Sequence, residues 1–356
     1  MTPRRRSETV SLFLTVFIIV SVVRSPLAGS LFFQGQPLEE NRVAKVGGGN
    51  PKHDAVEVSV FGVDVLIPSL AMDCALEHAI NGLSRFLQDL RNIYILLPES
   101  GKLPCQAKFE RMEVHSKVTC ISENSVFSRS SAALNVTNSN GWIADTSRRG
   151  WYYQQLLKLT FVLYPGVTLS NNFLIWDSDN ILLAPYSPFI GKSHRFPLRQ
   201  NESCGPTPAK LNGTKIGSYW PATRELLSKG KYSPAEVLEN YNCDCVVHQM
   251  VIHKPVMLTL LRHLCENDNM HLTPLTCANT ILSNIPSDAD PKFGLSEYEI
   301  YFSWLSMTQR SLIQYDTTTK YQRTGQQGFH CRELQPRMKK ASSTDVTYLV
   351  AEKVYY

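Results

Sequence analysis

Apolar positions along the chain form strand-like runs and one-sided helical patterns, which follow each other in the order of an α/β protein. A strand-like run at 61–68 precedes residues 72–90, where apolar side chains recur every three or four positions, as on one face of a helix. A second strand-like run follows at 92–98. Because a strand–helix–strand unit makes its strands parallel, we predict an α/β fold with a mostly parallel central sheet. The same patterns predict further strands at 113–121, 173–183 and 246–253, and helices at 150–164, at 255–265 and after Ser296.

Two acids stand at the end of one strongly apolar run. Four apolar or aromatic residues, beginning at Phe173, lead into Asp177 and Asp179, and turn-forming residues bound the run on both sides. Burying an unpaired carboxylate is costly, so a buried strand that ends in two of them needs a partner for their charge. Carboxylates suit hard divalent cations such as Mg or Mn, which in turn hold the phosphates of a substrate. We therefore predict that Asp177 and Asp179 bind a metal ion and, through it, a diphosphate.

The helix predicted at 150–164 leads directly into this strand. Gln154 and Lys158 lie four residues apart on it and can point the same way. An amide and a cation beside a pair of carboxylates would suit an anionic, hydroxyl-rich ligand. The alternative interpretation is a solvated face on a helix of the core.

Later in the chain, two histidines and two acids admit both a structural and a functional interpretation. His248 and His253 lie in one predicted strand, where single histidines are more often structural than ligands. Ser296 can cap a helix with Glu297 and Glu299 in its first turn, which accounts for both acids as partners of the helix dipole. A functional role for Glu297 is the competing interpretation.

The N-terminal region has the pattern of a targeting segment. Residues 10–23 are almost wholly apolar and follow three arginines at 4–6. This pattern fits a signal peptide and also a short type II membrane anchor, which we favour. Either one places the bulk of the chain in the lumen or outside the cell. We divide the chain into a cytosolic tail and membrane segment at 1–33, a Gly-rich stem at 34–55, the main domain at 56–338 and a peripheral C-terminal segment at 339–356.

Sequons and cysteines agree with a luminal location. Acceptor sequons for N-glycosylation begin at Asn135, Asn201 and Asn212. Several of the nine cysteines should pair in an oxidising compartment, and the odd number leaves at least one free or paired between chains. The formal net charge of +5 is partly due to the three N-terminal arginines, and the remainder is too scattered to predict a nucleic-acid partner.

Three functions compete for the acid pair. In the first, which we favour, a divalent ion held by the carboxylates stabilises a nucleotide diphosphate as a glycosyl group leaves it. In the second, Asp177 is a phosphoryl-transfer nucleophile and Asp179 an acid/base, as in haloacid-dehalogenase-like phosphatases. That class carries the motif on its opening strand, followed by Gly-Thr, whereas Asn180 and Ile181 follow it here. In the third, the acids form a structural calcium site, or cap a turn, in a non-catalytic luminal binding protein.

Three short blocks of the sequence occur in the order seen in a family of glycosyltransferase-like proteins. They are Gly150-Trp151-Tyr152 with Gln154, Gln155 and Lys158, then Asp177-Ser178-Asp179, then Ser296-Glu297-Tyr298-Glu299. The resemblance runs over residues 60–335. More broadly, the chain resembles nucleotide-sugar glycosyltransferases of the A-type fold.

This resemblance implies a single Rossmann-like domain that uses Mn or Mg to move a sugar from a nucleotide-sugar donor to a glycan or glycoprotein acceptor. It implies a single-pass type II protein of the Golgi or ER membrane, with secretion as the alternative. It implies that Asp177 and Asp179 bind the metal and the diphosphate, with Asp179 catalytic, and that Gln155 and Lys158 contact the sugar nucleotide. It implies that Glu297 faces the acceptor as a base. A third metal ligand is expected at His330, with His248 as the second choice.

Overall fold

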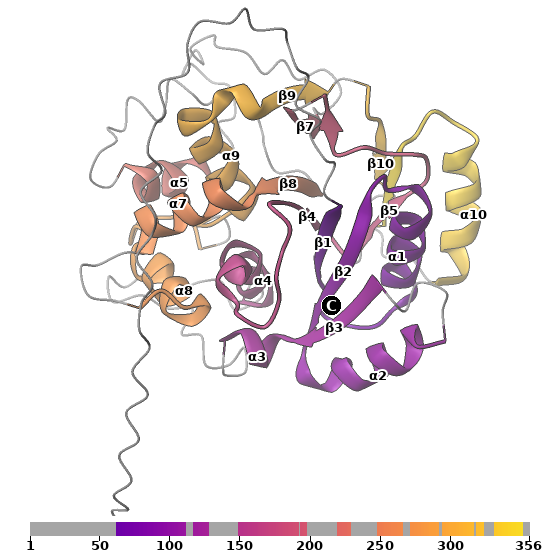
Figure 1. Cartoon of the computed structure of the whole chain (residues 1–356), viewed down its shortest axis with the longest axis horizontal. Coiled ribbons are helices and arrows are strands. Elements are labelled where there is room, and N and C mark those ends of the chain that lie inside the picture. Colours follow the sequence, from indigo (N-terminus) through magenta and orange to yellow (C-terminus); the bar gives the residue numbers. More distant parts are fainter. Residues whose placement is uncertain are drawn as a thin grey trace, which may run out of the picture. The chain divides into compact units, whose positions relative to one another are not determined.

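The central sheet of the computed structural model consists of five strands: β1 (Val63–Pro68), β2 (Leu90–Leu97), β3 (Val118–Ser122), β4 (Asn172–Trp176) and β8 (Gln249–His253). Their spatial order is β3-β2-β1-β4-β8 (Figure 1). The first four strands are parallel, and β8 runs antiparallel to β4 at one edge. The predicted α/β fold with a mostly parallel sheet is confirmed.

The structure describes residues 62–111, 117–127, 149–191, 193–197, 219–228, 248–265, 271–291, 294–316, 318–323 and 331–351. All of them fall in one compact unit, Val58–Tyr356. The predicted membrane segment, the stem, the three sequons and His330 lie outside the described residues. Within the described ranges, no helix has the length and apolar character needed to cross a membrane.

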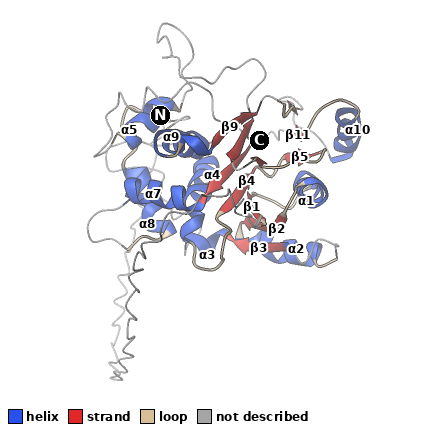
Figure 2. Ribbon diagram, turned by 45° about the horizontal axis from the view of Figure 1, so that its top comes forward, coloured by secondary structure: helices blue, strands red, loops and turns tan. Residues whose placement is uncertain are grey.

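Helices cover both faces of the sheet (Figure 2). One face packs against α1 (Cys74–Phe86) and α2 (Glu99–Phe109), and the other against α4 (Arg149–Thr160), α7 (Lys254–Cys265), α8 (Pro274–Ser283) and α9 (Glu297–Thr308). Val65 and Ile67 of β1 face the first group and Leu66 the second, so both faces of the strand are apolar, as expected for a buried parallel strand. The other helices are α3 (Glu123–Phe127), α5 (Trp220–Leu227), α10 (Cys331–Ser342) and the 3₁₀ turns η4 (Phe161–Leu163) and η5 (Arg310–Leu312).

The helices predicted from one-sided apolar patterns correspond to α1, to α4 with η4, to α7 and to α9. The sequence patterns did not predict α2, α3, α5, α8 or α10. Only Cys105 and Phe109 of α2 are buried, so its apolar residues form no stripe that a sequence pattern would reveal. A capping box with Thr273 at the N-cap starts α8. Its N3 position, three residues after the N-cap, is Thr276 instead of the usual Glu or Gln, so the sequence signature is absent.

The apolar run at 173–183 is not one strand. β4 ends at Trp176, the chain turns through Asp177 and Asp179, and β5 (Asn180–Leu182) begins. β5 belongs to a second sheet of order β10-β11-β5, with β10 (Tyr321–Arg323) and β11 (Tyr348–Val350). In that sheet, β11 lies between β5 and β10 and is buried, although it falls in the segment predicted to be peripheral. A third sheet has the order β6-β7-β9 and consists of β6 (Phe189–Ile190), β7 (Ser193–Pro197) and β9 (Ile313–Asp316).

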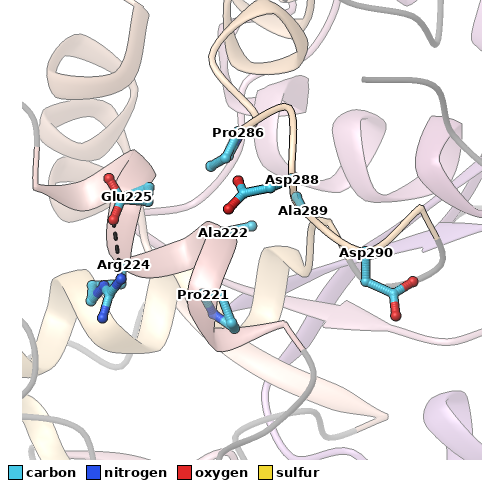
Figure 3. A pocket seen from close by; sticks show the side chains of 8 residues that line it. All are labelled: Pro221, Ala222, Arg224, Glu225, Pro286, Asp288, Ala289 and Asp290. Carbon is cyan, nitrogen blue, oxygen red and sulfur yellow. Dashed lines mark hydrogen bonds and ion pairs between the residues drawn. The ribbon is translucent and has the colours of Figure 1, made fainter. Parts of the chain in front are cut away.

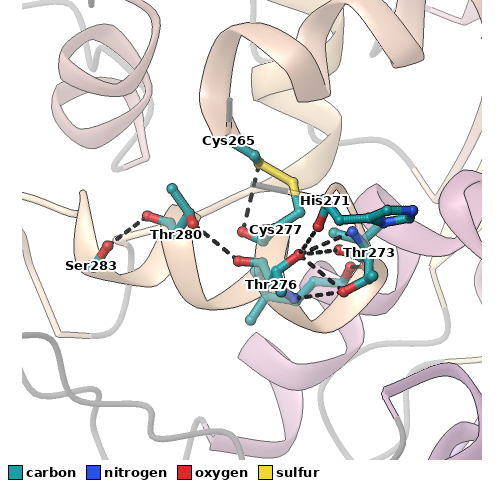
Figure 4. The surroundings of a disulfide bond; sticks show 9 residues. Cys265, His271, Thr273, Thr276, Cys277, Thr280 and Ser283 are labelled. Atoms are coloured by element: carbon teal, nitrogen blue, oxygen red, sulfur yellow. Dashed lines mark hydrogen bonds between the residues drawn. A yellow bond between two sulfur atoms is a disulfide. The ribbon is translucent and has the colours of Figure 1, made fainter. Parts of the chain in front are cut away.

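Three disulfides connect the described elements. Cys74–Cys331 joins the start of α1 to the start of α10, Cys105–Cys120 joins α2 to β3, and Cys265–Cys277 joins α7 to α8 (Figure 4). The expectation that several cysteines pair is confirmed, and multiple disulfides indicate an oxidising compartment. The other cysteines, Cys204, Cys243 and Cys245, lie outside the described residues.

Candidate metal and diphosphate site

The turn between β4 and β5 carries the two predicted acids. It lies just beyond the carboxyl end of β4, where open parallel sheets bind their ligands. The Asp177 amide donates to the His248 carbonyl at 3.0 Å, and the Asn180 amide donates to the Asp177 carbonyl at 3.0 Å. On the other side, the Ala351 amide donates to the Asp179 carbonyl at 2.7 Å. Backbone contacts from both sides therefore fix the turn.

Three side chains contact the carboxylate of Asp177. Lys158 Nζ donates to Oδ1 at 2.7 Å and the Tyr298 hydroxyl donates to the same oxygen at 2.9 Å. His248 Nδ1 lies 3.2 Å from Oδ2. Burial alone would raise the pKa of Asp177, but the charge of Lys158 and the hydrogen bond from His248 hold it below its usual value. Asp177 is therefore a carboxylate at neutral pH.

Lys158 forms a second ion pair behind Asp177. Its Nζ lies 2.7 Å from Glu297 Oε1, and the side chains of Lys158 and Glu297 are 5% and 1% exposed. Burial would lower the pKa of Lys158, but the two neighbouring carboxylates raise it above its usual value. Burial and the negative charge of Asp177 raise the pKa of Glu297, which Lys158 only partly offsets. The ammonium of Lys158 also lies 4.7 Å from the ring centre of Tyr298.

Asp177, Asp179 and His248 form a candidate site for a metal ion. One ligand atom from each residue can be chosen so that all three lie within 4.8 Å of one another. Two adjacent ligands of an octahedral Mg or Mn ion, each about 2.1 Å from it, lie roughly 3 Å apart. The 3.2 Å between Asp177 Oδ2 and His248 Nδ1 is close to that spacing. The donor atoms and their separation therefore fit a divalent cation. His248 was the second choice for a third ligand, and His330, the first choice, lies outside the described residues.

A cavity of about 230 Å³ opens over these residues. Gln155, one of the residues expected to contact the sugar nucleotide, lines it, and its Oε1 accepts from the Glu297 amide at 3.4 Å. Glu297 itself is 1% exposed and is not among the lining residues. The lining residues are Pro68, Trp151, Gln154, Gln155, Lys158, Asp177, Ser178, Asp179, Tyr219, His248 and Tyr298.

Sequence reasoning did not single out three of the aromatic residues in this lining. The rings of Trp151 and Tyr219 stack with their centres 5.6 Å apart. The Tyr298 hydroxyl reaches Asp177 from the first turn of α9. Trp151 and Tyr298 stand inside the recognised sequence blocks, so their positions gave a usable signal. Tyr219 follows a polar, irregular stretch of sequence that gave none.

A larger cavity, of about 410 Å³, lies between α5 and the loop after α8 (Figure 3). Arg224 and Glu225 form an ion pair of 3.1 Å at its edge, and Asp288 and Asp290 also line it. Within the part of the chain that the structure describes, the only group of three side chains arranged to hold a metal is the one at Asp177. The smaller cavity is therefore the candidate site.

No family model matches the sequence, and no curated protein matches it at a significant level. Solved structures with a similar fold include the apo form of the bifunctional glycosyltransferase WbbM, at 12% identity over 86% of this chain and a TM-score of 0.38. The match covers 48% of WbbM, so this chain spans about half the length of that protein. Apo mouse xyloside xylosyltransferase 1 matches at 9% identity over 82% of this chain and 97% of its own, with a TM-score of 0.34.

The galactosyltransferase LgtC, solved with donor and acceptor sugar analogues, matches at 11% identity over 81% of this chain and 86% of its own, again with a TM-score of 0.34. These are glycosyltransferases, and the likeness is distant in both sequence and structure. Likeness at this level does not establish a shared activity. Any conclusion about function must therefore come from the residues of the site.

Proposed function

We propose that the chain is a metal-dependent glycosyltransferase that moves a sugar from a nucleotide-sugar donor to a glycan or glycoprotein acceptor. One observation carries the proposal: at the carboxyl end of β4, Asp177 Oδ2 and His248 Nδ1 lie 3.2 Å apart beside Asp179, in a cavity that the buried cation of Lys158 also lines. Anionic ligands for a divalent ion and a fixed positive charge are what a metal-bound diphosphate requires.

Asp177, Asp179 and His248 would hold the ion. Two carboxylates and one imidazole favour Mn over Mg, because imidazole is a poorer ligand for Mg. When bound, such an ion supplies Lewis-acid stabilisation of the negative charge on a departing diphosphate. A volume of about 230 Å³ is below the roughly 300–1,000 Å³ of a whole ligand site, and it suits the phosphate-bearing part of a donor.

The remaining residues of the site position the ligands and the donor. Lys158 holds the Oδ1 atom of Asp177, which leaves Oδ2 facing His248. Gln155 and Lys158 are proposed to contact the sugar nucleotide, as the sequence resemblance implies. For Glu297 we propose a positioning role through Lys158, because its buried carboxylate pairs with the ammonium of Lys158 at 2.7 Å.

We propose that this activity takes place in the lumen of the Golgi or ER, with residues 10–23 as a type II anchor, or outside the cell if that segment is cleaved. The three disulfides and three sequons support an oxidising, glycosylating compartment.

A thermal-shift screen of nucleotide sugars with and without Mn²⁺ tests the proposal. We expect at least one nucleotide sugar to raise the melting temperature of the wild type only when Mn²⁺ is present. Asp179→Asn should remove this shift, whereas Asp288→Asn, in the other cavity, should keep it. The proposal fails if no donor stabilises the wild type, or if Asp179→Asn keeps the full shift. Metal-dependent release of phosphate from an aryl phosphate, without any effect of a nucleotide sugar, would instead favour a phosphatase.

A further inference from the structure

Arg323 comes to the candidate site from a distant part of the sequence. It ends β10, which pairs with β11, and β11 pairs in turn with β5. In this register Arg323 lies opposite Val350, and Val350 lies opposite Asn180, the residue after Asp179. The second sheet therefore brings an exposed arginine beside the acid-bearing turn.

A hydrogen bond from Arg323 fixes the tautomer of His248. Its Nη2 atom lies 2.7 Å from His248 Nε2. A guanidinium can only donate hydrogen bonds, so Nε2 must accept, and a neutral imidazole then carries its proton on Nδ1. That Nδ1–H faces Asp177 Oδ2 at 3.2 Å. In this arrangement neither ring nitrogen of His248 offers a lone pair to a metal ion.

Both routes by which His248 could bind a metal require Arg323 to leave. If Nδ1 is the ligand atom, the proton must move to Nε2, where it would face the N–H group of Arg323. If Nε2 is the ligand atom, the ion must take the place of the guanidinium. Arg323 is exposed in this structure, so a change of its conformation disturbs no packed core.

We propose that Arg323 couples metal binding to diphosphate binding. Without a diphosphate it donates to His248 Nε2 and keeps this histidine from the metal; with a diphosphate in the cavity it moves to the phosphate oxygens, and His248 becomes free to bind. Arginine is suited to this exchange, because its planar fork of donors binds phosphate with two parallel hydrogen bonds. The inference rests on the metal site of the proposed function and makes Arg323 a positioning residue for His248.

Mn²⁺ binding, measured by the EPR signal of free Mn²⁺, tests the coupling, with inorganic pyrophosphate as the diphosphate probe. Pyrophosphate should tighten Mn²⁺ binding to the wild type by about 5-fold or more. Arg323→Met should bind Mn²⁺ alone more tightly than the wild type and should gain much less from pyrophosphate. Arg337→Met, which removes the same charge from an ion pair with Glu333 on α10, should behave like the wild type.

Loss of a positive charge would by itself strengthen the binding of a cation such as Mn²⁺. The comparison of Arg323→Met with the wild type at position 323 is therefore repeated in a His248→Ala background. Coupling through His248 predicts that Arg323→Met then has little effect on the binding of Mn²⁺ alone. The same tightening in both backgrounds would overturn the inference, as would an Arg323→Met protein that binds like the wild type. If Mn²⁺ fails to bind the wild type even with pyrophosphate, the metal site and the proposed function fail with it.

The tautomer gives a second readout, which is recorded on the wild type. The ¹⁵N shifts of the His248 ring, assigned by comparison with His248→Gln, should show the Nδ1–H form in the free wild type. Addition of Mg²⁺ with pyrophosphate should change these shifts, and Mg²⁺ alone at the same concentration should change them far less. An Nε2–H form in the free protein would overturn the inference.

Discussion

Lys158 Nζ lies 2.7 Å from Glu297 Oε1, although the two residues are 139 positions apart and come from different helices. The same ammonium lies 2.7 Å from Asp177 Oδ1. One buried cation thus serves two carboxylates, and the group of three has a net negative charge when all are ionised. Two members of this group, Lys158 and Asp177, line the cavity, so its net negative charge would help to attract a divalent cation.

Lys158→Met should destabilise the protein strongly. Removing one partner from a buried ion pair leaves the other charge uncompensated, which costs about 3–5 kcal/mol. The free energy of unfolding from urea titration checks this. Lys158→Met combined with Glu297→Gln should recover part of the loss, because the double variant removes one of the two stranded charges.

The surface provides a matched comparison for that variant. Lys108 Nζ pairs with Glu77 Oε1 at 2.6 Å, but these side chains are 46% and 32% exposed. Lys108→Met should therefore change the free energy of unfolding by less than about 1 kcal/mol. Equal effects of Lys158→Met and Lys108→Met would contradict the idea that burial makes the inner pair important.

Gly82→Ala should destabilise the contact between α1 and β5. A Cβ atom at Gly82 would lie 2.5 Å from the Leu182 carbonyl oxygen, and backbone cannot move aside as a flexible side chain can. We expect a loss of about 1–3 kcal/mol from overpacking, which outweighs the gain of roughly 1 kcal/mol in helix propensity. Urea unfolding measures the net change. Gly150→Ala is the control, because nothing lies within 4 Å of the added Cβ there, and a comparable loss in that variant would contradict the steric explanation.

The central sheet and the acid-bearing turn could be predicted from the sequence because their signals are local. Apolar runs separated by a helix with apolar residues on one face indicate parallel strands, and two acids after such a run mark the strand end. Lys158 was also a candidate, because it stands in the helix just before that strand. In each case, short stretches of neighbouring residues carried the information.

The residues that the C-terminal part of the chain brings to the candidate site could not be predicted in the same way. Tyr321–Arg323 is a strand of three residues with two of them exposed, so it has no apolar alternation to detect. Its place beside Asp179 depends on pairing with β11, which is also only three residues long. The burial of Glu297 likewise depends on Lys158, which a helix-cap interpretation does not consider. The pattern of the sequence therefore does not predict which short elements pair over long distances along the chain.

Removal of the Cys74–Cys331 disulfide should cost more stability than removal of Cys265–Cys277. The first closes a loop of 257 residues and the second a loop of 12 residues. In the chain-entropy model, the expected costs are about 5.5 and about 3 kcal/mol. Paired Cys→Ser variants, compared by urea unfolding under oxidising conditions, measure both. A larger loss for the shorter loop would show that local packing of α7 on α8, and not loop closure, decides the effect.

His194 gives the fold a pH dependence that is independent of the candidate site's acids. It is 2% exposed, and its Nε2 lies 3.1 Å from Asn172 Oδ1. The ring of His253 lies 5.8 Å away and shares the same asparagine oxygen, at 2.8 Å from its Nδ1. Burial, with a smaller effect from His253, lowers the pKa of His194 to about 4.

The sign of the effect follows from comparison with the unfolded chain, where histidine has a pKa of about 6.5. Above that pH, both states are neutral and the stability is full. As the pH falls from about 6.5 towards 4, the unfolded chain takes up a proton that folded His194 does not, so stability falls, by up to about 3 kcal/mol. His194→Gln should lower stability at pH 7 but flatten the decline between pH 7 and 4.5, which urea midpoints at a series of pH values would reveal. Parallel pH profiles for the wild type and His194→Gln would mean that other groups cause the acid sensitivity.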